Sequence, residues 1–338
     1  MTIILLLFLV MTAHGRTVTD MAGRRVEIPD VINKVFTDRF TSLIVFALDE
    51  NILCNATFRV GEEGKKFISK EYYTGKPLVE TETEEILKLR PDVILMAHFG
   101  DATKADADAM QKKLNIPVLV IEFGIAYSRS IYVFLGDALN RVATANRIVA
   151  WIDACLTPLA VRLAAIPESQ RPAAYYAEGP LGLNTEPAAS IHSQVMEYLH
   201  IRNVAQAKTG GMHGMSEVSM EQLLEWNPEV VLVWTGFPAG MGLPGGEGRK
   251  STREHITTNL AWAKVKAVKT GRVYQIPSLP FGWFDRPPSS NCIAGALWLA
   301  KTLYPALDFD LRAALKDYFR LFYHVAVTDE DVEWLLSH

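Results

Sequence analysis

Residues 281–289, Phe-Gly-Trp-Phe-Asp-Arg-Pro-Pro-Ser, combine in one loop several side chains that could bind a small ligand. Trp283 and Phe284 offer flat apolar area for stacking, and Arg286 offers a planar guanidinium that holds anions through two parallel hydrogen bonds. The two prolines that follow stiffen the loop. We therefore expect Trp283, Phe284 and Arg286 to contact a ligand. The structural alternative is that Arg286 pairs with the aspartate beside it, or that the loop packs on the following helix.

Further aromatic and polar side chains follow the segments that we expect to form buried strands. Open parallel sheets bind ligands at the carboxyl ends of their strands, where such side chains meet. The candidate ligand contacts are Arg39, Phe40, His98, Phe99, Phe123 and Tyr127 in the first half of the chain, and Tyr176, Glu178, Trp234 and Phe237 in the second. Each of them taken singly is more often a packed aromatic or a solvated charge than a ligand contact.

The sequence lacks the motifs of catalysis, of a resident cofactor and of a preformed metal site. No two of its eight histidines have the i, i+4 spacing of a helical metal site, and neither G-x-S-x-G nor H-E-x-x-H occurs. Cys54, Cys155 and Cys292 lack C-x-x-C spacing and are interpreted as small buried hydrophobes. Residues 240–245 match G-x-G-x-x-G but include a proline and open no helix. We predict no catalytic residue, cofactor or metal ligand; coordination of a bare ion across a cleft is a minor alternative.

Two similar units each begin with a glutamate at the start of a helix. Glu84 opens E-E-I-L-K-L-R-P-D-V-I-L-M-A (84–97), and Glu221 opens E-Q-L-L-E-W-N-P-E-V-V-L-V-W (221–234). In both units a short amphipathic helix precedes a proline and then a buried strand. Either glutamate alone is explained by its favourable interaction with the helix dipole. The matched pair indicates two equivalent units with a shared role.

A long helical pattern at residues 129–166 stands between these units and must position them. Apolar residues recur along it at steps of three and four, as expected for one buried helical face. As a single helix it would span about 55 Å, with a bend at Pro158. Strand and helix patterns alternate on either side of it at the spacing of βαβ units.

The sequence therefore predicts an α/β fold of two Rossmann-like lobes with mainly parallel sheets. The lobes span residues 16–128 and 167–338, one long interdomain helix (129–166) joins them, and a ligand cleft lies between them. Because a helix bends less readily than a coil linker, we expect the lobes to move little against each other.

Composition and the amino terminus narrow the class of protein. Of the 338 residues 49% are hydrophobic, and the formal net charge of −4 gives no basic surface for nucleic acid. The first fifteen residues contain an apolar run too short to span a bilayer, followed by Ala13-His14-Gly15. This resembles a secretory signal peptide, although no basic residue precedes the run. We expect cleavage near Gly15 and a periplasmic location.

The chain resembles the solute-binding proteins of ABC importers that handle iron–siderophore complexes, haem, cobalamin and some metal or oxyanion ligands. The resemblance rests on the opening V-T-D-M-A-G-R-R-V-E-I-P (18–29), the two glutamate units, the central helix and residues 281–289. It covers most of the mature chain and indicates the family more sharply than the ligand. It implies two α/β lobes on one helix with the ligand between them.

The resemblance also implies partners. In this family a glutamate on each lobe forms a salt bridge with an arginine of the membrane permease, and these glutamates map to Glu84, or its neighbour Glu85, and to Glu221. We expect a monomer that captures a metal chelate, such as a ferric siderophore or haem, and delivers it to the permease and ATPase complex without catalysing a reaction.

Three alternatives to this function remain. The same transport role could serve an oxyanion such as molybdate or tungstate, or a corrinoid. A metalloenzyme on the same two-lobe scaffold would need more cysteines to hold its clusters. An adhesion module would expose an apolar patch in place of a cleft.

Overall fold

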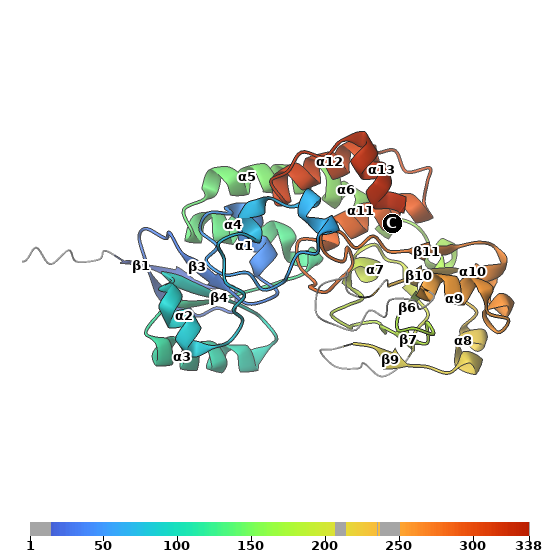
Figure 1. The fold of residues 1–338 in the computed structure, drawn as a ribbon, viewed down its shortest axis with the longest axis horizontal. Helices are drawn as coiled ribbons and strands as arrows, with labels where there is room; N and C mark the ends of the chain where they lie inside the picture. Colours follow the sequence, from blue (N-terminus) through green and yellow to red (C-terminus); the bar gives the residue numbers. More distant parts are fainter. Residues whose placement is uncertain (1–14, 207–213, 235, 237–250, 338) are drawn as a thin grey trace, which may run out of the picture.

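The computed structural model describes residues 15–206, 214–234, 236 and 251–337, which form two α/β lobes connected by helices, as the sequence predicts (Figure 1). Almost all of the predicted signal peptide (1–15) lies outside these residues, and its cleavage stays a prediction. No helix within the described ranges is both long enough and apolar enough to cross a membrane.

The first lobe contains a hairpin and a three-stranded parallel sheet with helices on both faces. Strands β1 and β2 pair antiparallel, and the order of the parallel sheet is β3-β4-β5. Alternate strand residues face opposite sides: Phe36 and Ile94 pack toward α2 and α3, whereas Val35 and Val93 pack toward α1 and α4. The elements are β1 (Gly15–Thr19), β2 (Arg25–Pro29), β3 (Val35–Thr37), α1 (Ser42–Leu48), η1 (Glu63–Phe67), η2 (Lys70–Tyr72), α2 (Thr83–Leu89), β4 (Val93–Ala97), α3 (Asp101–Leu114), β5 (Val118–Ile121) and η3 (Ile125–Tyr127).

The connecting stretch is helical almost throughout, but it is not one rod from residue 129. It consists of α4 (Ser128–Ala138), α5 (Val142–Trp151), a π-helical turn η4 (Ile152–Leu156) and α6 (Thr157–Ala164). A turn at residues 139–141, in which Asn140 has a φ of 57°, separates α4 from α5. The two helices pack so closely that a Cβ added to Gly136 would lie 2.4 Å from Cβ of Ala145. The continuous helix therefore covers residues 142–164, and the predicted start at 129 is wrong, because a left-handed residue ends α4 where the apolar pattern continues.

The second lobe repeats the arrangement around a four-stranded parallel sheet of order β11-β10-β6-β8. Adjacent residues of β6 face opposite cores: Tyr175 packs with α8 and α9, and Tyr176 packs toward α7 and α11. The elements are η5 (Glu168–Gln170), β6 (Ala173–Ala177), β7 (Asn184–Thr185), α7 (Gln194–Tyr198), β8 (Arg202–Asn203), β9 (Ser216–Glu217), α8 (Met220–Trp226), β10 (Val230–Val233), α9 (Thr252–Thr258), η7 (Trp262–Lys264), α10 (Lys266–Lys269) and β11 (Val273–Gln275).

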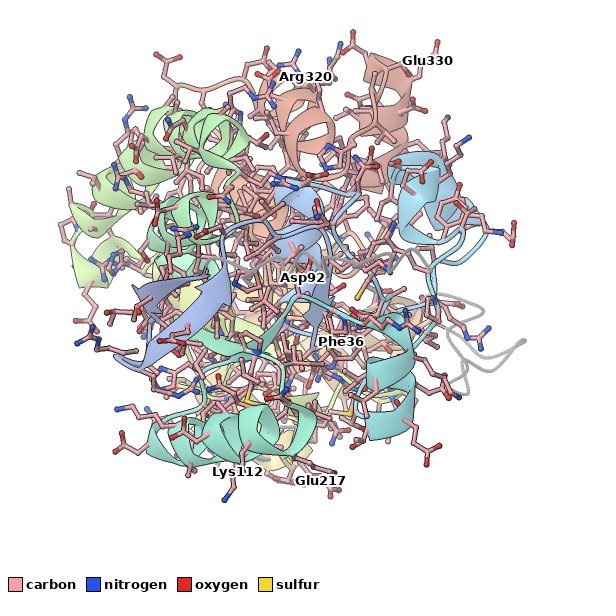
Figure 2. The ribbon with its side chains drawn as sticks, turned by 90° about the vertical axis from the view of Figure 1, so that its left-hand side faces the viewer. Phe36, Asp92, Lys112, Glu217, Arg320 and Glu330 are labelled. Carbon is pink, nitrogen blue, oxygen red and sulfur yellow. The ribbon has the colours of Figure 1, made fainter. Side chains whose placement is uncertain are left out.

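Three helices close the chain: α11 (Cys292–Leu303), α12 (Leu311–Phe322) and α13 (Asp329–Ser337). The first two pack against each other in the large core, and α13 follows them. Phe67 of the first lobe stacks on Trp334 of α13, with ring centroids 5.6 Å apart. In Figure 2, α12 and α13, marked by Arg320 and Glu330, lie above the first-lobe sheet that carries Phe36. The C-terminal helices therefore contact both lobes, and the lobe boundaries at residues 128 and 167 stay predictions.

Candidate functional site

Three phenylalanines meet at the carboxyl edge of the first sheet, each from the loop after a different strand. The ring centroids of Phe40 and Phe99 lie 4.9 Å apart, those of Phe40 and Phe123 5.1 Å, and those of Phe99 and Phe123 4.7 Å. Phe40 and Phe123 are buried, whereas Phe99 is 40% exposed. The expectation that these side chains gather is met, and Phe99 presents an aromatic surface at this edge.

Asp38, which is not among the predicted site residues, connects the end of β3 to the end of β4 through hydrogen bonds. Its Oδ2 accepts a hydrogen bond from the Ala97 amide at 2.6 Å, and its Oδ1 accepts from the amides of Phe40 and Thr41 at 3.0 and 2.9 Å. Burial raises the pKa of Asp38, and these hydrogen bonds oppose that rise. The carboxylate thereby fixes the loop that carries Phe40.

His98 and Glu122 form a polar pair beside the aromatic group. His98 Nδ1 lies 2.8 Å from Glu122 Oε1, and each side chain is about one fifth exposed. His98 is one of the predicted contacts, whereas Glu122 is not. Strand β5 ends at Ile121, so Glu122 is the first residue after it and lies beside His98 in the loop after β4.

A cavity of about 460 Å³ lies between the lobes at this position. The first lobe contributes the His98–Glu122 pair and the η3 loop, and the second contributes α7. Its lining residues are His98, Glu122, Phe123, Ile125, Ala126, Tyr127, Gln194, Glu197 and Tyr198. The cavity is therefore the described part of the predicted interlobe cleft, and of the predicted contacts it contains His98, Phe123 and Tyr127. No lysine or arginine occurs among the described residues that line it.

Arg286 lies in the second lobe, surrounded by carboxylates rather than open to an anion. Its Nη1 lies 2.7 Å from Glu178 Oε1 and also pairs with Asp285, and its Nη2 lies 3.1 Å from Glu186 Oε1. All four side chains are at most 8% exposed. The prediction that Arg286 clamps an anion is therefore corrected in favour of the structural alternative, because three buried carboxylates already occupy the guanidinium.

Side chains from other segments of the second lobe also contact this Arg286 cluster. Tyr176 donates a hydrogen bond from its hydroxyl to Asp285 Oδ1 at 3.0 Å, and His192 Nδ1 lies 2.9 Å from Asp285 Oδ2. The guanidinium carbon of Arg286 lies 4.3 Å from the centroid of the Trp234 ring, a cation–π geometry. Tyr176 is fully buried, so its predicted contact with ligand is corrected to a role inside the cluster.

Trp283 and Phe284 are also buried and do not face the cleft. The Trp283 indole donates to the carbonyl of Leu279 at 2.8 Å. The loop packs so closely on α11 that a Cβ added to Gly295 would lie 2.1 Å from the Trp283 carbonyl oxygen. The predicted ligand contacts of both aromatics are therefore wrong, because the loop serves as packing for the next helix.

The Arg286 cluster gives Glu178 an unusual protonation state. Burial, only partly offset by Arg286, raises the pKa of Glu178 to about 9. Between about pH 4.5 and 9 the folded protein then keeps a proton that the unfolded chain releases, so this residue lowers stability as pH rises through that window.

Glu178→Gln tests this assignment, because glutamine mimics the protonated acid. We expect the variant to match the wild type near pH 4.5 and to exceed its free energy of unfolding by at least about 1 kcal/mol at pH 8. Urea unfolding at the two pH values measures the difference, with the exposed Glu225→Gln as control. If the free energies of unfolding of variant and wild type differ by the same amount at both pH values, Glu178 is ionised in the folded state.

The remaining predicted residues lie at the surface or outside the described ranges. Arg39 is about half exposed and pairs with Glu80 at 2.5 Å. Glu84 and Glu221 are exposed in the first turns of α2 and α8, so both are accessible to a partner. Phe237 lies outside the described ranges, and within them no group of three or more His, Cys, Asp or Glu side chains is arranged to hold a metal ion.

The model of a family described as periplasmic binding protein matches residues 37–280. The molybdate-binding protein MolA of Haemophilus influenzae is 27% identical, over 92% of each chain.

Solved structures agree in fold. An ABC transporter solute binding protein from Sulfurospirillum deleyianum superposes with a TM-score of 0.83 at 26% identity, covering 96% of this chain and 99% of that one. Helicobacter pylori CeuE, solved as a nickel–histidine complex, superposes with a TM-score of 0.65 at 18% identity, covering 96% and 99%, and supports the fold alone.

Proposed function

Since the chain belongs to the periplasmic binding protein family and is the substrate-binding component of an ABC transporter, we propose that its interlobe cleft captures a metal chelate without net negative charge. A ferric hydroxamate siderophore and a nickel–histidine complex are examples of this class. The chelate is then delivered to the permease. The family and the compared proteins are transport proteins rather than enzymes, and the proposed role includes no chemical step.

The observation that carries this proposal is the character of the cleft lining. Glu122 and Glu197 supply carboxylates, Tyr127 and Tyr198 supply aromatic rings with hydroxyls, and none of the described lining residues is a lysine or an arginine. Such a lining favours a metal chelate that is neutral or positively charged and whose organic groups can stack on the tyrosine rings. A volume of about 460 Å³ is within the range of small-molecule sites.

A screen by thermal unfolding identifies the ligand class directly. The mature protein is heated with ferric siderophores, haem, cobalamin, nickel–histidine or molybdate, because a ligand that binds only the folded state raises the melting temperature by mass action. We expect the largest rise with a neutral or cationic chelate. A rise with molybdate alone would refute the proposal.

Glu122→Gln separates the candidate ligands further. Glutamine keeps an acceptor for His98 but removes the negative charge, so we expect chelate binding to weaken about tenfold, the loss of one charge-assisted contact. Isothermal titration calorimetry measures the change, with Glu85→Gln, an exposed glutamate outside the cleft, as control. Unchanged chelate affinity would remove Glu122 from the site.

The second candidate ligand is an oxyanion such as molybdate, favoured by the similarity to MolA over 92% of both chains. Hydrogen-bond donors for it in the described cleft are the side chains of Tyr127 and Gln194. Under this alternative Glu122→Gln has the opposite effect, since it removes a like charge, and molybdate binding tightens.

A further inference from the structure

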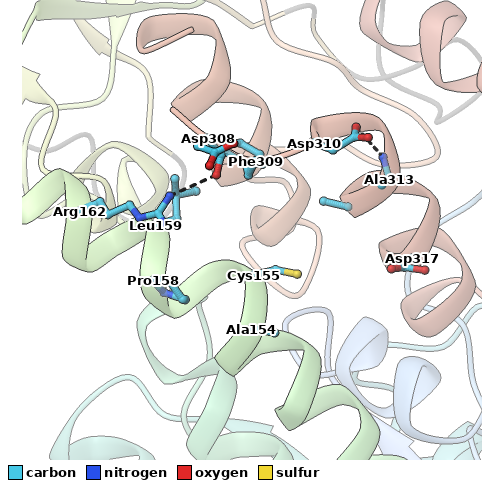
Figure 3. Close-up of a pocket in the computed structure, with 11 residues that line it drawn as sticks. Ala154, Cys155, Pro158, Leu159, Arg162, Asp308, Phe309, Asp310, Ala313 and Asp317 are labelled. Atoms are coloured by element: carbon cyan, nitrogen blue, oxygen red, sulfur yellow. Dashed lines mark hydrogen bonds between the residues drawn. The ribbon is translucent and has the colours of Figure 1, made fainter. Parts of the chain in front are cut away.

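A second cavity, of about 240 Å³, lies between the connecting helix and α12 (Figure 3). It has no lining residue in common with the interlobe cleft. The connecting helix contributes Pro158 and Leu159, and the segment at the start of α12 contributes Phe309 and Ala314. This cavity is separate from the proposed transport site.

The local sequence explains why space remains at this position. The π-helical turn η4 inserts a residue into the connecting helix, and the Thr157 amide donates to the carbonyl of Ile152, five residues back. Pro158 follows and has no amide to continue the regular ladder. The side chains facing the gap at Ala154, Ala313 and Ala314 are too small to fill it.

The cavity combines an apolar floor with an acidic wall. Leu159 and Ala314 are buried at the floor. The side chains of Asp308, Asp310 and Asp317 line the wall, where Figure 3 shows Asp308 beside Arg162. Arg162 donates to the backbone carbonyl of Asp308 at 3.2 Å rather than to its carboxylate.

The other two carboxylates keep free acceptor capacity. Asp310 Oδ1 accepts one hydrogen bond from the Ala313 amide at 3.1 Å, and Asp317 Oδ1 accepts from Arg320 at 2.6 Å. A carboxylate has about four acceptor positions. Arg320 forms an ion pair with Asp317, so three aspartates face two arginines, Arg162 and Arg320, and the wall keeps an excess of one negative charge.

The thiol of Cys155, in the same wall, responds to this environment. Burial raises its pKa, and the charge on Asp317 raises it further. The thiol is partly exposed, so a reagent can reach it. Cys155 therefore reports whether the cavity is occupied.

We propose that this cavity binds a small amine whose cationic group faces Asp308 and Asp317 and whose short apolar body rests on Leu159 and Phe309. The volume corresponds to about eight water-sized groups at roughly 30 Å³ each. An occupant would bridge the connecting helix and α12, two segments that pack on both lobes.

Protection of Cys155 from alkylation tests the proposal. The full mature chain is treated with iodoacetamide in the presence of benzylamine, benzyl alcohol or benzoate, three probes of similar size and different charge. Peptide mass spectrometry follows each cysteine separately. At a benzylamine concentration five times its dissociation constant, about one sixth of the cavities are free, so alkylation of Cys155 should slow about sixfold. The alcohol and benzoate at the same concentration should slow it less than about twofold.

Two variants locate the effect. Ala313→Leu fills the cavity from an exposed helix position. In this variant benzylamine should no longer change the rate at which iodoacetamide alkylates Cys155. Ala306→Leu, exposed but outside the cavity, should preserve the full sixfold protection. Absence of protection in the wild type, equal protection by benzyl alcohol, or protection that persists in Ala313→Leu would each overturn the proposal.

Discussion

Arg286→Ala is expected to lower the free energy of unfolding by about 3–5 kcal/mol, because it leaves buried carboxylates without their counter-charge. Within the described residues, Arg286 pairs with all three acids, Glu178, Glu186 and Asp285, whereas His192 contacts Asp285. Removal of Arg286 also takes away the cation that stacks on Trp234. Equilibrium unfolding in urea, followed by far-UV circular dichroism, measures the loss.

Two further variants make this result interpretable. Arg286→Lys keeps the charge but loses the planar fork, so we expect an intermediate loss and a measurable value even where the alanine variant fails to fold. Arg320→Ala, at an exposed position on α12, should change stability by less than about 0.5 kcal/mol. A loss below about 1 kcal/mol for Arg286→Ala would mean that the carboxylates take up protons at little cost.

Charge reversal at both proposed docking residues, Glu84→Lys with Glu221→Lys, is expected to reduce uptake to background. The two carboxylates are exposed on equivalent helices of separate lobes and would give the permease a two-point docking surface. Neither residue lines the cleft, so ligand affinity in the isolated protein should stay unchanged. Ligand accumulation in cells and calorimetry on the purified protein measure the two quantities.

The control is an equal charge change away from these helix starts. Asp106→Lys on α3 with Glu225→Lys near the end of α8 reverses two exposed carboxylates, one on each lobe. We expect transport by this control to remain close to the wild type. Normal uptake by the Glu84 and Glu221 variant would exclude these glutamates from docking, whereas loss of ligand affinity would show that they act on the cleft.

Local patterns in the sequence were sufficient for the architecture. Parallel strands that are buried on both faces read as apolar runs, and the repeated glutamate–proline units mark two equivalent βα segments. The same logic identified the aromatic group, since Phe40, Phe99 and Phe123 each follow a strand end. The turn at residues 139–141 was missed because apolar spacing continues through it, while a single left-handed residue, Asn140, ends the helix.

The amino-acid sequence by itself thus determined two parallel α/β lobes, the helical connection and the side chains gathered at the edges of the sheets. Only the tertiary structure decided which of these side chains remain available to a ligand. Arg286 and Glu186 are 100 residues apart, and no local pattern indicates that they pair. Burial of the loop against α11 depends on the close approach at Gly295, which the sequence does not show. Whether a residue is available to a ligand depends on what packs on it, and the partners of Arg286 come from a distant part of the chain.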